Sequence, residues 1–418
     1  MASTYVNDLR LNEMATGDAS GSWGTNTNTN LSLIAEAWGS GSEGITGTSH
    51  TITIADGASD AARAYAMTNV IIPNGGIKMV VADGAGSGAA VTDVLDMTGG
   101  TGNVGLGSGN LGTAITTGTD NVAIGEASLD AVTTGADNTA VGDNAGGALT
   151  TGGNNVAIGS GALLVATTAA DNTAIGTLAL TANSSGTDNT AVGFSAGDAV
   201  TTGSDNTLVG DNAGGAITTG GDNTVVGSGA LATEDGNGQN VAVGSAALAT
   251  LNAGADAGNV AVGYQSLTAA TTGIDNVAVG FQAGDAVTTG SDNTLIGDSA
   301  GGALTTGAGN VAIGSGALLT QTTASDNTAV GLEALEANTS GTGNTALGRR
   351  ALEANTTAAN NTAVGYKAID TNTTGANLVG VGANALGANS TGSGNTAVGK
   401  NALDANTTAS NNTAVGLD

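Results

Sequence analysis

The sequence has no cysteine, a single proline (Pro73) and few aromatic residues, and each absence excludes a class of protein. Without cysteine there is neither a disulfide bond nor a thiolate metal site. Aromatic residues make up 2% of the chain, which is too little for an ordinary globular core. Glycine numbers 72 but follows no three-residue rule, so the chain is not collagen-like.

Positive charge is also scarce. Seven Lys and Arg stand against 35 Asp and Glu, the net charge is −28, and no basic residue lies between Lys78 and Arg349. Because so acidic a surface repels nucleic acid and anionic lipid, we expect neither as a partner. The sequence lacks an apolar run long enough to span a membrane, and its first ten residues lack the apolar segment of a signal peptide. We therefore expect no membrane insertion and no ordinary secretion.

A 17-residue repeat fills the chain from Asn103 almost to Asp418. Its signature, Asn-Thr-Ala-Val-Gly or a close variant, occurs 19 times, and 16 of the 18 intervals are 17 residues long. The copies begin at Asn103, Asn121, Asn138, Asn155, Asn172, Asn189, Asn206, Asn223, Asn240, Asn259, Asn276, Asn293, Asn310, Asn327, Asn344, Asn361, Leu378, Asn395 and Asn412. A repeat this short and regular predicts stacked coils.

The first 98 residues do not repeat, so we expect two domains, 1–98 and 99–418. Apolar patterns in the first domain predict helices over 31–38 and 59–67 and strands over 51–54 and 77–81. We expect a small α+β or mostly β domain there. Residues 97–102 are rich in Gly and Thr and predict a flexible joint.

Each position of the repeat, numbered from the signature Asn as zero, has its own chemistry. Position +3 is always Val, Ile or Leu, position +4 is always Gly, and position +2 is mostly Ala. Since neighbouring side chains of a strand face opposite ways, we expect +3 in the interior and the Ala of +2 and +7 where backbones approach closely. Glycine at +4 predicts a turn with positive φ.

A second large side chain comes from either of two positions. Position +8 is usually Leu, but five copies have Gly there and then carry a large aliphatic residue at +11. These pairs are Gly146 with Leu149, Gly197 with Val200, Gly214 with Ile217, Gly284 with Val287, and Gly301 with Leu304. Because a close-packed interior demands such an exchange, the repeat predicts an all-β parallel β-roll, a β-solenoid with two short strands per coil.

The remaining positions predict how the coils stack and associate. Stacking places each signature Asn above another, so their amides can form a ladder of hydrogen bonds. The paired threonines at +12 and +13 point to opposite faces of a strand, which argues against a flat ice-binding array. A roll this thin is marginal alone. Three rolls around an axis would bury a second face, and we therefore expect a homotrimer about 90 Å long.

The signature Asn-Thr/Val-Ala-Val/Ile-Gly followed by Ala-Leu resembles the head repeat of YadA-like trimeric autotransporter adhesins, over residues 103–418. This resemblance implies a left-handed, trimeric roll with a structural and adhesive role and no catalytic residues. Residues 4–10 (Thr-Tyr-Val-Asn-Asp-Leu-Arg), 21–25 (Gly-Ser-Trp-Gly-Thr), Asn30-Leu31 and 83–90 resemble N-terminal regions of structural and tail-fibre proteins of marine bacteriophages.

Together these features predict a phage tail fibre on the virion, outside the cell. Residues 1–98 would dock to tail or capsid proteins, and the roll would project as a shaft that supports host adhesion. Two alternatives remain: a capsid decoration, head fibre or self-assembling filament, and a segment of a bacterial trimeric surface adhesin. Further partners would be a host surface glycan or a distal tip protein after Asp418.

Two sets of residues in the repeat are candidate sites. Acidic residues before the signature Asn would stack as like charges, which Ca²⁺ would relieve or solvent would screen. They include Asp120, Asp137, Asp171, Asp188, Asp205 and Asp222. Positions +5 and +6 hold every aromatic and basic residue of the repeat region, and we expect an exposed recognition edge or a lateral contact between protomers. Its residues are Phe194, Tyr264, Phe281, Tyr366, Arg349 and Arg350, with Lys367 and Lys400.

Catalysis has little support in the sequence. His50 is the only histidine, and the Ser and Asp residues of the repeat recur as part of its pattern. A glycan-cleaving spike needs paired carboxylates in a groove, and the regular repeat offers almost no irregular insertions to carry them. We therefore expect no enzyme activity and no cofactor other than Ca²⁺.

Overall fold

The computed structural model describes five strands in the first part of the chain and most of the repeat region. The described residues are 4–6, 11–13, 68–72, 76–82, 91–95 and 102–417, without 112–114, 235, 237, 255 and 256. The chain divides into two compact units, Met1–Tyr65 and Ala66–Asp418. Within the described residues there is no helix with the length and apolar character that crossing a membrane requires.

Antiparallel strands precede the repeats. In the first unit, β1 (Thr4–Val6) pairs with β2 (Leu11–Glu13). The second unit begins with a three-stranded sheet in the order β3 (Thr68–Ile72), β4 (Gly76–Ala82) and β5 (Val91–Leu95). The predicted strand 77–81 is confirmed as part of β4. The predicted strand 51–54, the predicted helices and nearly all of the predicted joint 97–102 lie outside the described residues.

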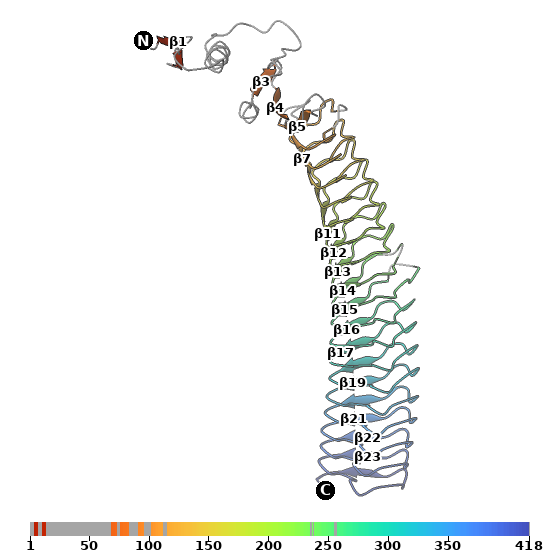
Figure 1. Ribbon diagram of the computed structural model, residues 1–418. Coiled ribbons are helices and arrows are strands. Elements are labelled where there is room, and N and C mark those ends of the chain that lie inside the picture. Colours follow the sequence, from red (N-terminus) through yellow and green to blue (C-terminus); the bar gives the residue numbers. More distant parts are fainter. Residues whose placement is uncertain are drawn as a thin grey trace. The chain divides into compact units, whose positions relative to one another are not determined.

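From β6 onward the chain is a parallel β-solenoid, which confirms the predicted fold class (Figure 1). Its strands are β6 (Val104–Leu106), β7 (Val122–Ile124), β8 (Thr139–Val141), β9 (Val156–Ile158), β10 (Thr173–Ile175), β11 (Thr190–Val192), β12 (Thr207–Val209), β13 (Thr224–Val226), β14 (Val241–Val243), β15 (Val260–Val262), β16 (Val277–Val279), β17 (Thr294–Ile296), β18 (Val311–Ile313), β19 (Thr328–Val330), β20 (Thr345–Leu347), β21 (Thr362–Val364), β22 (Val379–Val381), β23 (Thr396–Val398) and β24 (Thr413–Val415). Each strand pairs with the same positions of the next coil, as Thr173 does with Thr190.

The prediction of two strands per coil is wrong, because the described residues contain one three-residue strand per coil. The second half of each coil is a series of turns, since positions +6 and +8 take a left-handed backbone. In one coil Ala127 has φ 51° and Leu129 has φ 50°. Strands require negative φ. The turns are nevertheless bonded from coil to coil, for example by the Leu129 N–H donating to the Ala145 carbonyl at 3.1 Å.

The predicted interior position +3 is also wrong, because the strand presents +2 inward and +3 outward. Ala123 is fully buried, whereas the next residue, Ile124, is 38% exposed. The signature Asn is buried at position zero, and side chains alternate along a strand, so +2 must share its face and +1 and +3 must point outward. The buried columns are zero, +2, +7, +8, +11 and +14.

The predicted exchange between +8 and +11 is confirmed, and position +2 takes part in it. Leu208 replaces Ala at +2 in a coil whose +8 residue is Gly214, and a Cβ on Gly214 would lie 2.8 Å from the Leu208 Cδ2. Conversely, position +2 is Gly380 where the preceding coil has Ile369 at +8, and a Cβ on Gly380 would lie 2.6 Å from the Ile369 Cγ1. Three positions therefore share one interior volume.

The signature asparagines form the predicted ladder. Asn276 donates through Nδ2 to the Asn259 Oδ1 at 3.2 Å and to the Gly290 carbonyl at 2.9 Å. Its own Oδ1 accepts from the Asn293 backbone N–H at 3.1 Å and from the Asn293 Nδ2 at 3.0 Å. Asn276 is fully buried, so the ladder satisfies a polar column that would otherwise be costly inside the roll.

A second buried amide ladder occupies position +11 near the C-terminal end. Asn355 donates through Nδ2 to the Asn338 Oδ1, and Asn372 to the Asn355 Oδ1, both at 3.0 Å. Asn389 continues the series with a bond of 3.1 Å to Asn372. Here amides replace the aliphatic residues of other coils, because each of these buried amides finds a partner one coil away.

Glycine at +4 has the positive φ that the sequence predicts. Gly280 has φ 145°, and a Cβ there would lie 2.4 Å from the carbonyl oxygen of Gly297 in the next coil. Any larger residue would push two coils apart. Position +12 adds a second fixed contact, since the Thr133 Oγ1 donates to the Thr150 carbonyl at 3.1 Å.

Candidate recognition edge

Positions +5 and +6 form an exposed strip after the glycine turn, here called the +5/+6 edge. All four aromatic residues of the repeat region lie on it. Their exposed fractions are 58% for Phe194, 48% for Tyr264, 51% for Phe281 and 48% for Tyr366. Large apolar side chains are usually buried, so this column has exposed aromatic surface that the fold itself does not use.

Two of these aromatic residues form a stacked pair. The rings of Tyr264 and Phe281, one coil apart, are 5.5 Å apart between centroids and inclined by 15°. Beside them the Gln282 Nε2 donates to the Gln265 Oε1 at 3.1 Å. The backbone also connects the two coils, because the Gln282 N–H donates to the Tyr264 carbonyl at 2.9 Å. The pair and its two amides are therefore held in a fixed arrangement.

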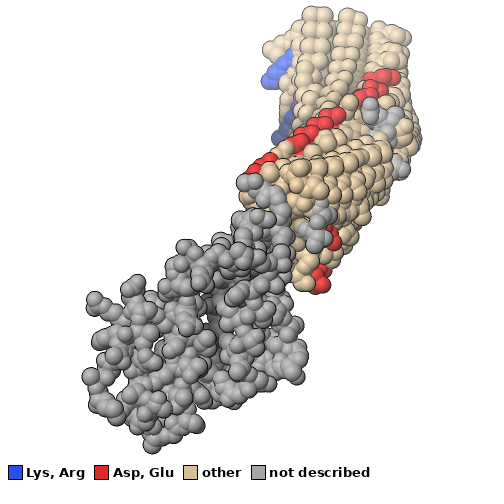
Figure 2. Space-filling view, turned by 90° about the horizontal axis from the view of Figure 1, so that it is seen from above, with Lys and Arg blue, Asp and Glu red and all other residues tan. Residues whose placement is uncertain are grey.

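The predicted calcium residues lie in one exposed column before the signature Asn. They are Asp120, Asp137, Asp171, Asp188, Asp205 and Asp222, all exposed and all with φ between 58° and 60°. Figure 2 shows acidic side chains in lines along the visible face of the solenoid. In the described part of the chain, the group of three carboxylates with ligand atoms within 4.8 Å of one another is elsewhere. Calcium binding by this column stays a prediction.

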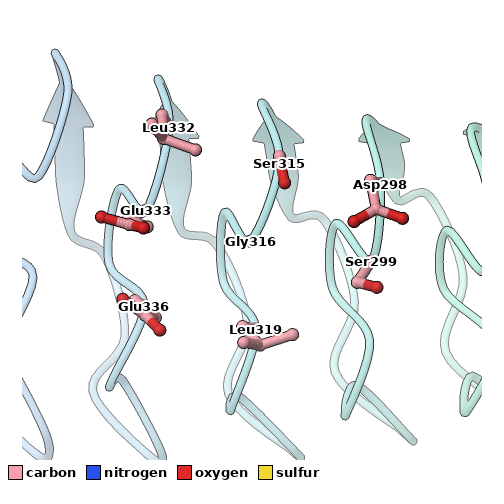
Figure 3. Close-up of a pocket in the computed structure, with 8 residues that line it drawn as sticks. All are labelled: Asp298, Ser299, Ser315, Gly316, Leu319, Leu332, Glu333 and Glu336. Atoms are coloured by element: carbon pink, nitrogen blue, oxygen red, sulfur yellow. The ribbon is translucent and has the colours of Figure 1, made fainter.

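A shallow hollow of about 230 Å³ opens on the +5/+6 edge (Figure 3). It is lined by Asp298, Ser299, Ser315, Gly316, Leu319, Leu332, Glu333 and Glu336. The hollow exists because Ser315 and Gly316 are the smallest pair at +5 and +6 among these three coils, while larger side chains stand on both sides. Gly316 has φ 65° and the space beside it is open up to the Glu333 Cγ at 3.9 Å.

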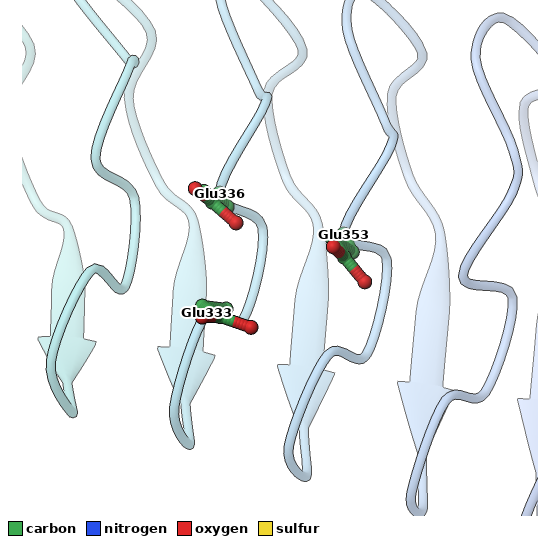
Figure 4. A group of neighbouring side chains, drawn as sticks. All are labelled: Glu333, Glu336 and Glu353. Carbon is green, nitrogen blue, oxygen red and sulfur yellow. The ribbon is translucent and has the colours of Figure 1, made fainter.

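The carboxylates of Glu333, Glu336 and Glu353 form the group within 4.8 Å (Figure 4). Arg350 pairs through Nε with Glu333 and, at 3.4 Å, with Glu353. Burial raises the pKa of the Glu336 carboxyl, as do the negative charges of Glu333 and Glu353, while Arg350 opposes them. The hydrogen bond that Arg350 donates to Glu333 raises the pKa of the Arg350 guanidinium, as do the negative charges of Glu353 and Glu333. Arg350 thus offsets one of the three negative charges of this cluster.

The basic residues predicted on the edge differ in their contacts. Arg350 is held in the cluster just described, and the Lys367 Nζ lies 3.3 Å from the Asp370 Oδ2. Arg349 and Lys400 are exposed at +5. The structure therefore places the predicted edge residues on one surface but does not bring the four aromatic residues together, since Phe194 and Tyr366 stand apart from the stacked pair.

Sequence reasoning missed the hollow and the glutamate cluster. The available signal was the run of +5/+6 pairs in three successive coils, Asp298-Ser299, Ser315-Gly316 and Leu332-Glu333, in which a small pair lies between larger ones. No family model matches this chain, and no curated protein or solved structure is significantly similar to it.

Proposed function

We propose that this chain is a structural fibre protein of a phage virion, in which residues 1–98 attach to tail or capsid proteins and the solenoid is a trimeric shaft that supports host adhesion. The observation that carries this proposal is the outer face of the strands, formed by positions +1 and +3. Every side chain on it is Thr, Val, Ile or Leu, and none of the 35 acidic residues of the chain falls there.

This uncharged face is continuous along the solenoid. Its +3 side chains are partly exposed in every strand from β6 to β24, for example Ile158 at 37%, Ile313 at 36% and Leu347 at 48%. Nineteen strands at about 4.8 Å spacing make a strip roughly 90 Å long and about 10 Å wide. That area is close to the roughly 800 Å² that each partner buries in a stable interface.

A second copy of the same chain suits this face best, because both strips have the same spacing along the axis and the same uncharged, mostly β-branched surface. Acidic residues flank the strip at +16 and in places at +5, where they would stay in solvent. Three chains around one axis cover every strip and leave none exposed. The resulting fibre would be rigid, extended and acidic outside, as a projecting shaft requires.

The solution mass tests the assembly. We expect the full chain of 39.2 kDa to sediment at three times that mass in physiological salt. A single-chain mass at micromolar concentration would refute the trimeric shaft.

Electron microscopy tests the location. Virions labelled with an antibody against residues 103–418 should carry label on fibres at the tail. Label on the capsid, or on free filaments, would refute the tail assignment and support the decoration or filament alternatives.

A further inference from the structure

The stacked aromatic pair and the hollow lie next to each other on the +5/+6 edge. Position +5 of five consecutive coils is occupied by Tyr264, Phe281, Asp298, Ser315 and Leu332. Ser299, which lines the hollow, donates its backbone N–H to the Phe281 carbonyl at 3.0 Å. The aromatic platform therefore passes directly into the hollow, and both face solvent.

The walls of this combined site differ in chemistry. On one side of the hollow stand Asp298 and Ser299, and on the other stand Leu332, Glu333 and Glu336, above a floor at Gly316 (Figure 3). When these carboxylates are ionised, they accept hydrogen bonds and donate none. Gln282 adds a further acceptor, because its Oε1 has no partner among the described residues while its Nε2 is bonded to Gln265.

We propose that this site, from Tyr264 to Glu336, binds a neutral or amino-sugar oligosaccharide. Sugar rings combine apolar C–H faces, which pack on aromatic rings, with hydroxyl groups that donate to carboxylates and amides. One ring enters the hollow and donates to Asp298 and Glu336, and a neighbouring ring packs on the exposed surface of Tyr264 and Phe281.

The size and charge of the site select this ligand class. A hollow of about 230 Å³ is smaller than the roughly 300 Å³ of the smallest drug-sized pockets, which suits a single sugar ring. Three carboxylates around it repel uronic and sialic acids. Glu333 already has a cationic partner in Arg350, so Asp298 and Glu336 are the acids left to accept hydroxyl or ammonium groups.

In the proposed fibre this site would be the part that contacts sugars of the host surface. That biological role rests on the proposed function. Binding is measured with the isolated full chain, whereas fibre assembly is measured by mass and microscopy. Either proposal can therefore fail while the other holds.

Saturation-transfer NMR with maltotriose, N,N′,N″-triacetylchitotriose and its deacetylated form chitotriose as probes, and trigalacturonate as the anionic comparator, tests the site. We expect transfer to one or more of the first three and none to trigalacturonate. Gly316→Gln fills the hollow, and Gln265 and Gln282 show that glutamine accepts the left-handed backbone of this column. This variant should bind at least about tenfold more weakly.

Matched controls separate the site from the repeat. Gly229 occupies the same column with φ 63° and open space around it, so Gly229→Gln should fold like Gly316→Gln and keep wild-type binding. Tyr264→Ala with Phe281→Ala should weaken binding by at least about tenfold, whereas Phe194→Ala should not. Equal binding by Gly316→Gln and wild type, preferential binding of trigalacturonate, or no binding of any probe by the wild type would overturn the proposal.

Discussion

At the residue scale, the signature asparagine stabilises the stack through bonds that only a neighbouring coil can complete. Each interior Asn of the ladder donates to one coil and accepts from the other, and its burial leaves water no access to those groups. The sequence predicted this ladder because an amide both donates and accepts, so identical side chains in a self-similar column can bond to one another.

Asn276→Ala should therefore destabilise the solenoid. The substitution leaves the Asn293 backbone N–H and the Gly290 carbonyl without their partners inside the roll. Each unsatisfied buried group costs about 1–3 kcal/mol, so we expect the free energy of unfolding in urea to fall by at least that amount. The control is Asn212→Ala at the exposed position +6, where Ala127 and Ala246 already occupy the same left-handed backbone. Equal losses in both variants would contradict the role of the ladder.

Glu336 gives the protein an unusual response to acid. Burial and two neighbouring carboxylates raise its pKa in the folded state, so the folded protein takes up this proton before the unfolded chain does. The contribution of this carboxyl to the free energy of unfolding should therefore rise as the pH falls through the raised pKa of Glu336. It should stop rising below the pKa that Glu336 has in the unfolded chain.

Glu336→Gln should remove this part of the pH dependence and stabilise the protein at neutral pH. Urea unfolding at several weakly acidic pH values measures both effects. Asp198→Asn, in the same +9 column but away from the cluster, is the control. A wild type and a Glu336→Gln variant with the same pH slope would show that the glutamate cluster does not strain the fold.

At the scale of one coil, the structure corrects how the interior is filled. Position +3 varies little from coil to coil, which made it look like a core column. In fact +2, +8 and +11 change together, and coordinated change in volume is the better mark of an interior. The residues other than Ala at +2 were the signal that sequence reasoning passed over; they are Gly105, Leu208, Val225, Leu295 and Gly380.

A double-mutant cycle in one coil tests the shared volume. A Cβ on Gly301 would lie 2.8 Å from the Leu295 Cδ2, so Gly301→Leu alone should overpack the interior. Leu295→Ala alone should leave a cavity and cost about 2–5 kcal/mol. The double variant has Ala at +2, Leu at +8 and Leu at +11, which is the combination that Ala242, Leu248 and Leu251 form in a natural coil. We expect it to be more stable than the sum of the single effects by about 1 kcal/mol or more, and additive effects would disprove the exchange.

The absence of a second strand in each coil could not be predicted from the alternation of side chains alone. Leucine and isoleucine at +8 rarely adopt a left-handed backbone, and Leu129, Leu352 and Ile369 do so here. The exchange of Leu for Gly at this position reflects that backbone as well as the interior volume, because glycine takes positive φ without strain. The recognition edge could be predicted because +5 and +6 are variable positions of the repeat. Its hollow could not, because it depends on a small pair of side chains at +5 and +6 standing between larger pairs in the neighbouring coils.

At the scale of the whole molecule, the distribution of charge matters more than its total. In the described part of the repeat region most acidic residues lie at the turns and edges, Glu234 is buried, and the outer face of the strands has none. The protein has a net charge of −28, yet this one continuous apolar strip has no charged residue. An apolar strip of this size favours an interface with another chain over contact with water.

Val262→Asp combined with Val279→Asp places two like charges on that strip in adjacent coils. Both side chains point outward, so each coil should still form, and circular dichroism should match the wild type. Charges without partners in an apolar interface cost several kcal/mol, so the assembly should dissociate to the single-chain mass of 39.2 kDa. Ser228→Asp with Ser245→Asp adds the same charge at +5, where Asp143, Asp211 and Asp298 occur naturally, and should leave the mass unchanged. Dissociation by the control but not by the valine variant would move the interface from the strand face to the +5/+6 edge, and the glycan site could then not be open in the assembled fibre.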